Sequence, residues 1–225
     1  MIVAIDGPAG SGKSTIAKNT ARELGFRYLD TGAMYRAIAV RAHDLGIGFD
    51  EGEKLGEIAK GDIVEFGFSD NDPLPSRVFV AGKEVTDEIR SPIIDQAVSP
   101  VSAHPVVRDA LVARQRCLGA HDDYVVEGRD IGTVVFPDAE VKVFLTADAH
   151  ERARRRAAQN LERGIAHDFE QVLSDIKKRD ERDSTREASP LVVAKDAVEL
   201  DSTMMTIDYV TAVIVGLVRE AQARS

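Results

Sequence analysis

The stretch of the chain with the clearest chemistry is Gly7 to Thr15, which reads Gly-Pro-Ala-Gly-Ser-Gly-Lys-Ser-Thr and matches G-x-x-x-x-G-K-[ST] without a mismatch. Glycine lets a backbone adopt positive φ and pass close to an anion. The N–H groups of such a loop, and the positive end of the helix that follows, attract phosphate. Lys13 supplies a compact charge for the β- and γ-phosphates, and the Ser14 hydroxyl can ligate Mg²⁺. The stretch therefore predicts a site for a nucleoside triphosphate and Mg²⁺.

All nine residues of this loop are expected to contact the triphosphate: Gly7, Pro8, Ala9, Gly10, Ser11, Gly12, Lys13, Ser14 and Thr15. The motif is meaningful only between a strand and a helix. Residues 1–5 form a short apolar run, typical of a buried parallel strand. Residues 14–24 carry an apolar stripe at helical spacing, and Gly25 follows as a helix-ending glycine. Both flanks therefore favour a true phosphate-binding loop.

Arginines at predicted element ends could hold a second anion: Arg36, Arg108, Arg129, Arg152, Arg155, Arg156, Arg179, Arg182 and Arg186. A kinase whose acceptor is itself a phosphate needs such a site, because guanidinium groups offset the repulsion between the two anions. That acceptor is already anionic at neutral pH and needs no general base. Arg129 is the strongest candidate, since it follows an apolar strand and a glycine at the edge where α/β sheets bind ligands. The alternative for the others is a solvated basic surface of little energetic weight.

The composition narrows the class of protein. With 225 residues, of which 44% are hydrophobic and 30% charged, the chain is an ordinary globular one of one or two domains. Its net charge of −9 argues against binding a nucleic-acid polymer through overall charge. The one cysteine, Cys117, cannot form an intramolecular disulfide and is expected to be a small buried apolar group. No signal-peptide pattern or bilayer-spanning run is seen, so we expect a cytoplasmic protein without a membrane partner.

Hydrophobic periodicity predicts an α/β fold with a five-stranded parallel sheet flanked by helices. The strands are expected at residues 1–5, 26–29, 123–127, 141–146 and 197–200. The helices are expected at residues 14–24, 33–45, 51–59, 105–118, 149–164, 169–183 and 208–223. The apolar side of the helix at 105–118 is expected to consist of Val106, Ala110, Leu111 and Ala113.

Residues 61–97 interrupt this pattern. Between residues 62 and 85 apolar residues alternate with polar ones, and a turn-rich loop from Ser69 to Ser76 separates two such runs. Alternation of this kind predicts an antiparallel β-meander, which a parallel α/β core does not require. Residues 86–95 are expected to be helical or irregular. We therefore interpret residues 61–97 as a small inserted subdomain, with the core formed by residues 1–60 and 98–225.

The chain also resembles a known family, the bacterial cytidylate kinases, from residue 2 to about residue 215. The Gly-Arg-Asp-Ile-Gly-Thr-Val-Val-Phe-Pro run from Gly128 to Pro137 is the most specific part of the resemblance. The other segments that carry it are the phosphate loop, Tyr28 to Arg36, Val107-Arg108, Gln115-Arg116, Arg179-Asp180, Arg182-Asp183 and Ser189 to Leu191.

This resemblance implies a P-loop NTPase fold in which the insert binds a nucleoside monophosphate and residues near 152–186 form a helical lid over ATP. It implies direct in-line phosphoryl transfer from ATP, with Mg²⁺, to CMP and dCMP. The residues that match the family's monophosphate site are Thr31, Arg36, Ser99, Arg108, Arg129, Asp130, Asp183 and Arg186. Those that match its lid are Arg152, Arg155, Arg156 and Arg179. Charge on the transferring group would be stabilised by Lys13, Arg129, Arg155, Arg156 and Arg179.

The resemblance also explains why an arginine and an aspartate would face the base. Cytosine offers an amino donor at N4 and acceptors at N3 and O2, which an Asp130 acceptor and Arg108 or Ser99 donors complement. Uracil would place a carbonyl against Asp130, so UMP is expected to be a poor substrate.

The sequence also bears on three alternative functions. A small P-loop kinase for a metabolite such as shikimate would lack the β-meander and the run from Gly128 to Pro137. A GTPase switch would need Asn-Lys-x-Asp, which does not occur in the sequence. A nucleotide-binding module without catalysis would bind ATP but release no ADP when an acceptor is added. We expect a monomer that acts on small molecules.

Overall fold

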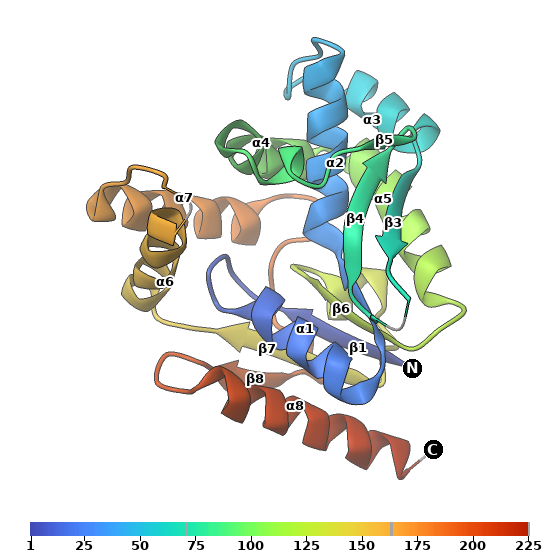
Figure 1. The fold of residues 1–225 in the computed structure, drawn as a ribbon, viewed down its shortest axis with the longest axis vertical. Helices are drawn as coiled ribbons and strands as arrows, with labels where there is room; N and C mark the ends of the chain where they lie inside the picture. The colour runs from blue at the N-terminus through green and yellow to red at the C-terminus, as the bar shows by residue number, and fades with distance from the viewer. Residues whose placement is uncertain (71, 163, 225) are drawn as a thin grey trace.

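In the computed structural model, which describes residues 1–70, 72–162 and 164–224, five parallel strands form the central sheet in the order β2-β6-β1-β7-β8. The strands are β1 (Ile2–Asp6), β2 (Arg27–Asp30), β6 (Tyr124–Gly128), β7 (Val141–Thr146) and β8 (Val198–Asp201). The five-stranded parallel sheet expected from the sequence is confirmed (Figure 1).

Helices cover both faces of this sheet because its central strands alternate their side chains between two cores. Val3 and Ile5 pack with α1 (Lys13–Leu24) and α8 (Ile207–Gln222). Ile2 and Ala4 belong to the opposite core, together with α2 (Thr31–Asp44), α3 (Gly52–Gly61), α4 (Pro92–Ala103) and α5 (Pro105–Gly119). Every residue of β1 is buried, which accounts for its continuous apolar run.

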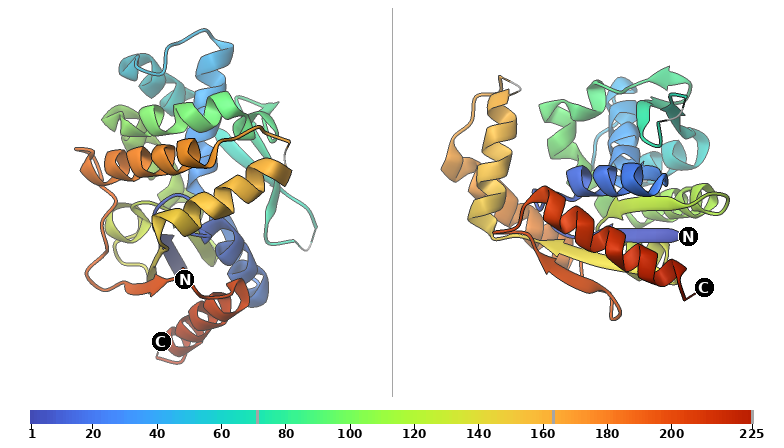
Figure 2. Two further views of the ribbon diagram at one scale, coloured as in Figure 1. Left: turned by 90° about the vertical axis from the view of Figure 1, so that its left-hand side faces the viewer. Right: turned by 60° about the horizontal axis from the view of Figure 1, so that its bottom comes forward.

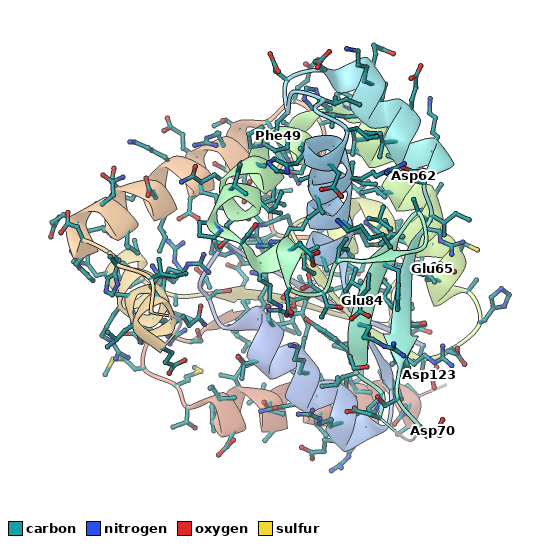
Figure 3. The ribbon with its side chains drawn as sticks, turned by 45° about the horizontal axis from the view of Figure 1, so that its top comes forward. Phe49, Asp62, Glu65, Asp70, Glu84 and Asp123 are labelled. Atoms are coloured by element: carbon teal, nitrogen blue, oxygen red, sulfur yellow. The ribbon has the colours of Figure 1, made fainter. Side chains whose placement is uncertain are left out.

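The antiparallel meander expected in the insert is a three-stranded sheet of order β3-β4-β5: β3 (Val64–Phe68), β4 (Pro75–Val80) and β5 (Lys83–Glu84). Val64, Val78 and Val80 share one core with α2. The loop between β3 and β4 reaches the central sheet, where Tyr28 N–H donates to the Pro73 carbonyl at 3.1 Å. Figure 3 shows Asp70 in this loop on the same side of the molecule as Asp123, which directly precedes β6, and shows Glu65 and Glu84 on the small sheet. Asn71, within the expected loop 69–76, lies outside the described residues.

A pair of helices, α6 (Ala149–Glu162) and α7 (Phe169–Thr185), stands apart from the sheet on the side away from the small sheet (Figures 1 and 2). Their own apolar cluster is small and contains Ala153, Leu173 and Ile176 as its buried members. Such a cluster is compatible with a segment that moves as a unit, because few apolar contacts tie it to the rest of the chain.

Some local expectations were wrong. Cys117 is exposed, because α5 turns Val107, Leu111 and Gln115 inward and Cys117 lies on its other side. For the same reason Ala113 is exposed and Val107 replaces it in the core. The expectation of helical or irregular structure for residues 86–95, in contrast, is confirmed: they contain a short 3₁₀ turn (Glu88–Arg90) and the first part of α4, which begins at Pro92, a favoured first helical residue. A π-helical turn, Ile131–Val135, follows β6.

Within the described ranges no helix combines the length and the apolar character that crossing a bilayer requires.

Candidate active site

The carboxyl ends of β1, β6 and β2 bring the predicted functional segments to one edge of the sheet. Asp6 pairs in register with Gly128, and Asp30 with Glu127. The phosphate loop leaves β1 here, the Arg129 segment leaves β6, and α2 begins after β2. Ligands bind at this edge in open α/β sheets, because loops and helix N-termini converge there.

The loop between β1 and α1 is shaped by its glycines. Gly7, Gly10 and Gly12 have φ angles of 147°, 77° and 94°. A Cβ atom on Gly7 would lie 2.0 Å from the Leu145 carbonyl oxygen, so only glycine fits there. The Lys13 ammonium is buried and donates to the Pro8 carbonyl at 2.7 Å. Burial, with Arg129 nearby, lowers the pKa of Lys13 well below its ordinary value, so an arriving polyphosphate would stabilise its charge.

A carboxylate that the sequence analysis did not assign lies beside Ser14. Glu127, at the end of β6, is buried and accepts a hydrogen bond from Ser14 Oγ at 3.0 Å and another from the Tyr28 hydroxyl. Hydroxyl and carboxylate oxygens are the ligands Mg²⁺ prefers, so this pair fits the ion. Across the described residues no group of three or more His, Cys, Asp or Glu side chains that could hold a metal ion occurs. The position of Glu127 at a strand end was a signal that the sequence analysis could have used.

A cavity of about 860 Å³ opens in front of the loop. Ala9, Gly10, Gly12, Lys13, Ser14 and Thr15 line one side of it. The same cavity is also lined by charged residues that the sequence predicted for phosphate binding or for the acceptor: Arg36, Arg108, Arg129, Asp130, Arg155, Arg156, Arg179, Asp183 and Arg186. This size is in the range of pockets that bury a nucleotide-sized ligand.

Asp130 is the centre of a buried charge cluster on the acceptor side. Its carboxylate accepts a hydrogen bond from Arg108, and Arg186 Nη2 lies 3.6 Å from its other oxygen. The Arg108 guanidinium lies 5.5 Å from the ring centroid of Tyr35. Arg108 Nε and Arg186 Nη2 are buried without a hydrogen-bond partner among the described residues. Unpaired buried donors of this kind are expected where a ligand supplies the acceptors.

Arg129, which follows β6, and Arg179, on α7, both line the cavity. Arg129 Nε donates to Asp183 Oδ2 at 2.9 Å, and Arg179 Nε lies 4.0 Å from the same carboxylate. Arg179 Nε is buried without a hydrogen-bond partner among the described residues. Burial, with the charges of Arg129 and Arg36, lowers the pKa of Arg179 to about 10. The pair therefore forms a positive site that an anion would stabilise.

The arginines of α6 differ in what they contact. Arg152 is buried and donates to the carbonyls of Ala147 and Ala9, at 2.8 and 3.2 Å, and pairs with Asp180 at 2.7 Å. It lies behind the phosphate loop and does not line the large cavity. Arg155 donates to the Ser11 carbonyl at 3.2 Å and to the Ser202 carbonyl at 2.7 Å. Arg156 pairs with Asp95, a residue that the sequence analysis did not single out.

Of the remaining predicted residues, Thr31 lines the large cavity, whereas Gly7, Pro8, Ser11 and Ser99 do not. Gly7, Pro8 and Ser11 form the back of the loop, and Ser11 is fully buried. Thr31 Oγ1 donates to the Glu127 carbonyl at 2.7 Å. Ser99 is buried on α4 and lines a neighbouring cavity of about 700 Å³ between α4, α6 and α7.

Comparison with known proteins identifies relatives of this chain. A family model described as "Cytidylate kinase" matches residues 3–220. The cytidylate kinase of Shouchella clausii (strain KSM-K16) is 49% identical over 97% of this chain and 96% of its own length. That of Enterococcus faecalis (strain ATCC 700802 / V583) is 48% identical over 97% of this chain and 95% of its own length. A solved structure of an uncharacterized protein from Eubacterium ventriosum ATCC 27560 shares the fold, with a TM-score of 0.50 and 16% identity over 97% of this chain and 98% of that one.

Proposed function

Because the chain belongs to the cytidylate kinase family of nucleoside monophosphate kinases, we propose that it transfers the γ-phosphoryl group of ATP to CMP and dCMP, forming CDP and dCDP. The observation that carries this proposal is a single cavity lined both by the phosphate loop and by the arginines and Asp130. A donor anion and an acceptor anion can therefore face each other in it.

The donor side would hold the triphosphate on the backbone of residues 7–15, with Lys13 at the β- and γ-phosphates. Arg152, through its contact with the Ala9 carbonyl, would keep this loop in shape. Ser14 would ligate Mg²⁺, with Glu127 fixing its hydroxyl, and the ion would neutralise charge between the β- and γ-phosphates. The loop after β8 lines the same cavity with Met204 and Met205, an apolar surface that suits the nucleobase of ATP.

The acceptor side would hold CMP through its phosphate and its base. Arg36 and Arg129 would bind the phosphate beside Thr31. Asp130 would accept from the cytosine amino group, while Arg108 and Ser99 would donate to the ring acceptors. Asp183 and Arg186 would bind the ribose end. The Nε of Arg108 supports this assignment, because it is buried without a hydrogen-bond partner among the described residues and its N–H can donate to the base.

Transfer would then need no protein base. An oxygen of the CMP phosphate forms the new bond to the γ-phosphorus as the bond from that phosphorus to the bridging oxygen of ADP breaks. Lys13, Arg129, Arg155, Arg156 and Arg179 would stabilise the negative charge on the transferring group. Residues 152–186 would close as a lid over ATP, and residues 61–97 would close over CMP against a core of residues 1–60 and 98–225. Closure would exclude water and keep ATP hydrolysis slow without an acceptor.

We further propose that the protein acts as a monomer in the cytoplasm, where its substrate ATP is available. The test of the function is a panel of acceptors, namely CMP, dCMP, UMP, AMP and shikimate, each with ATP and Mg²⁺, with ADP release coupled to NADH oxidation. We expect rapid ADP release with CMP and with dCMP, and with no other acceptor of the panel. Equal kcat/KM for UMP and CMP would contradict the assigned base pocket, and activity with shikimate alone would contradict the function.

A further inference from the structure

Asp95 lies in the first turn of α4, and its carboxylate joins two arginines from different sides of the cavity. Oδ1 accepts from Arg36 Nη2 at 3.1 Å, and Oδ2 accepts from Arg156 Nη2. Arg36 belongs to α2, in the core, whereas Arg156 belongs to α6, one of the two helices that stand apart from the sheet (Figure 2). One carboxylate therefore ties the proposed lid to the acceptor side.

This contact is partly shielded from solvent. The side chains of Asp95, Arg36 and Arg156 are 17%, 22% and 34% exposed. Among the described residues Asp95 is the only acidic group within ion-pair distance of either arginine. Burial alone would raise the pKa of Asp95, but the charges of Arg36 and Arg156 outweigh it and lower that pKa below its ordinary value. Asp95 is therefore a carboxylate anion at neutral pH.

Both arginines also line the large cavity with Lys13 and Arg129, and in the proposed reaction both would bind phosphate. Two guanidinium groups that converge without an anion repel each other, and Asp95 offsets that repulsion. A phosphate monoester carries −1.5 to −2 charges and three acceptor oxygens, so it can take over both arginines. While it does so, a carboxylate held against the same arginines opposes it by like-charge repulsion.

We propose that Asp95 is a positioning residue that acts as an internal anion: it occupies Arg36 and Arg156 while no acceptor phosphate is bound, holds α6 against α4, and is displaced when that phosphate arrives. The identity of the arriving ligand as CMP rests on the proposed function, but the exchange itself needs only a phosphate monoester. A purely structural strut would behave differently, because its loss would weaken every ligand alike.

The first test is binding to the Asp95→Asn variant, whose side chain has nearly the same shape but no charge. Isothermal titration calorimetry is run with CMP and with cytidine, which lacks the phosphate. We expect CMP to bind roughly tenfold more tightly, a gain of about 1.4 kcal/mol, and cytidine to be unchanged. The conservative variant Asp95→Glu should stay close to the parent protein in CMP affinity.

The matched control is Asp175→Asn. Asp175 lines the neighbouring cavity together with Asp95, but its carboxylate accepts from Gln171 and not from an arginine. If the tighter CMP binding in Asp95→Asn comes from the loss of its ion pairs, removing the charge of Asp175 should change CMP affinity by a factor of about two at most. If it comes from the summed electrostatic field of the nearby carboxylates, Asp175→Asn should also tighten binding. Weaker or unchanged CMP binding in Asp95→Asn, or an equal change for cytidine, would overturn the proposal.

The second test needs no nucleotide. Spin labels are placed at Leu161→Cys on α6 and Ile63→Cys before β3, both exposed positions outside the cavity, with Cys117→Ser to remove the exposed native thiol. Pulsed electron paramagnetic resonance of the ligand-free protein should give a longer and broader distance distribution in Asp95→Asn than with Asp95 intact. Identical distributions would overturn the proposal. If no ADP were released with CMP in the acceptor panel, the proposed function would be refuted. The distance measurement would still test the role of Asp95, because it uses no nucleotide.

Discussion

The Arg129 guanidinium donates to the Asp183 carboxylate at 2.9 Å, although the two residues are 54 positions apart in the chain. Arg129 follows β6 and Asp183 lies in the last turns of α7, so this contact connects the core sheet to the helical pair. Burial alone would raise the pKa of Asp183, but Arg129 and Arg179 lower it below its ordinary value. Asp183 therefore stays ionised and orients Arg129 toward the cavity.

Arg129→Ala should damage the acceptor side of the site. We expect the KM for CMP to rise at least roughly tenfold, with a much smaller change for ATP, because a charge-assisted bond to the acceptor phosphate is lost. Steady-state kinetics with each substrate varied in turn would measure this. Arg219→Ala, on the surface of α8, is the control. A rise in the KM for ATP instead would show that Arg129 serves the donor.

Lys13→Met should reduce kcat by about 10²–10³-fold or more, since one preorganised charge on the transferring group is removed. The fold should persist, because methionine fills similar space and the buried ammonium is already disfavoured by its surroundings. Single-turnover kinetics and circular dichroism of the same preparation would report both properties. Lys60→Met, at the exposed end of α3, should leave kcat unchanged. Full activity in Lys13→Met would exclude the loop as the triphosphate site.

Asp130→Asn should reduce discrimination between cytosine and uracil. In the parent protein kcat/KM for CMP should exceed that for UMP by roughly 100-fold or more, because uracil would place a carbonyl oxygen, itself an acceptor, against the buried carboxylate. An amide can donate to the uracil carbonyl, so the ratio should approach one even though both activities fall. The ratio is measured by competition between CMP and UMP in one reaction. An unchanged ratio would mean that another residue reads the base.

Glu127→Gln should raise the Mg²⁺ concentration needed for half-maximal velocity by about 10–100-fold, as is typical when a group that orients a metal ligand is altered. The reason is that Glu127 accepts the Ser14 hydroxyl hydrogen bond. Tyr28→Phe, which removes only the second hydrogen bond to that carboxylate, should cause a smaller change in the same direction. The measurement is a Mg²⁺ titration at fixed, saturating ATP and CMP. An unaltered Mg²⁺ requirement in Glu127→Gln would separate Glu127 from the metal.

The pH dependence of stability should contain a contribution from Asp6. Its carboxylate accepts from the N–H groups of Ile131 and Gly132, at 2.8 and 2.7 Å, but burial outweighs these bonds and raises its pKa to about 6. A folded-state pKa above the unfolded value means that the unfolded state loses its proton first. The free energy of unfolding should therefore fall as pH rises from about 4 to about 6, by about 3 kcal/mol from this group, and then level off. Titration of the Asp6 carboxyl carbon by NMR should give a midpoint near pH 6, and a midpoint below 4 would contradict the prediction.

Local patterns were enough to predict most of the architecture. The phosphate loop lies in one unbroken stretch, so its strand, glycines and helix could be predicted without knowing any partner. The alternation between residues 62 and 85 likewise indicated the small antiparallel sheet. Side-chain direction on a single helix was predicted less well: Cys117 was expected inside and is exposed, because α5 is rotated by packing that the sequence pattern does not contain.

The sequence by itself determined the chemistry that depends on neighbours in the chain, namely an anion-binding loop, a five-stranded parallel core and a supply of arginines at element ends. Only the tertiary structure decided how those charges pair. The sequence indicated no partner for Arg129, which pairs with Asp183, and Asp95 was not singled out, yet it pairs with both Arg36 and Arg156. The physical reason is that an ion pair depends on a few ångströms of separation, which the strand order and the docking of α4, α6 and α7 set, and spacing along the chain does not.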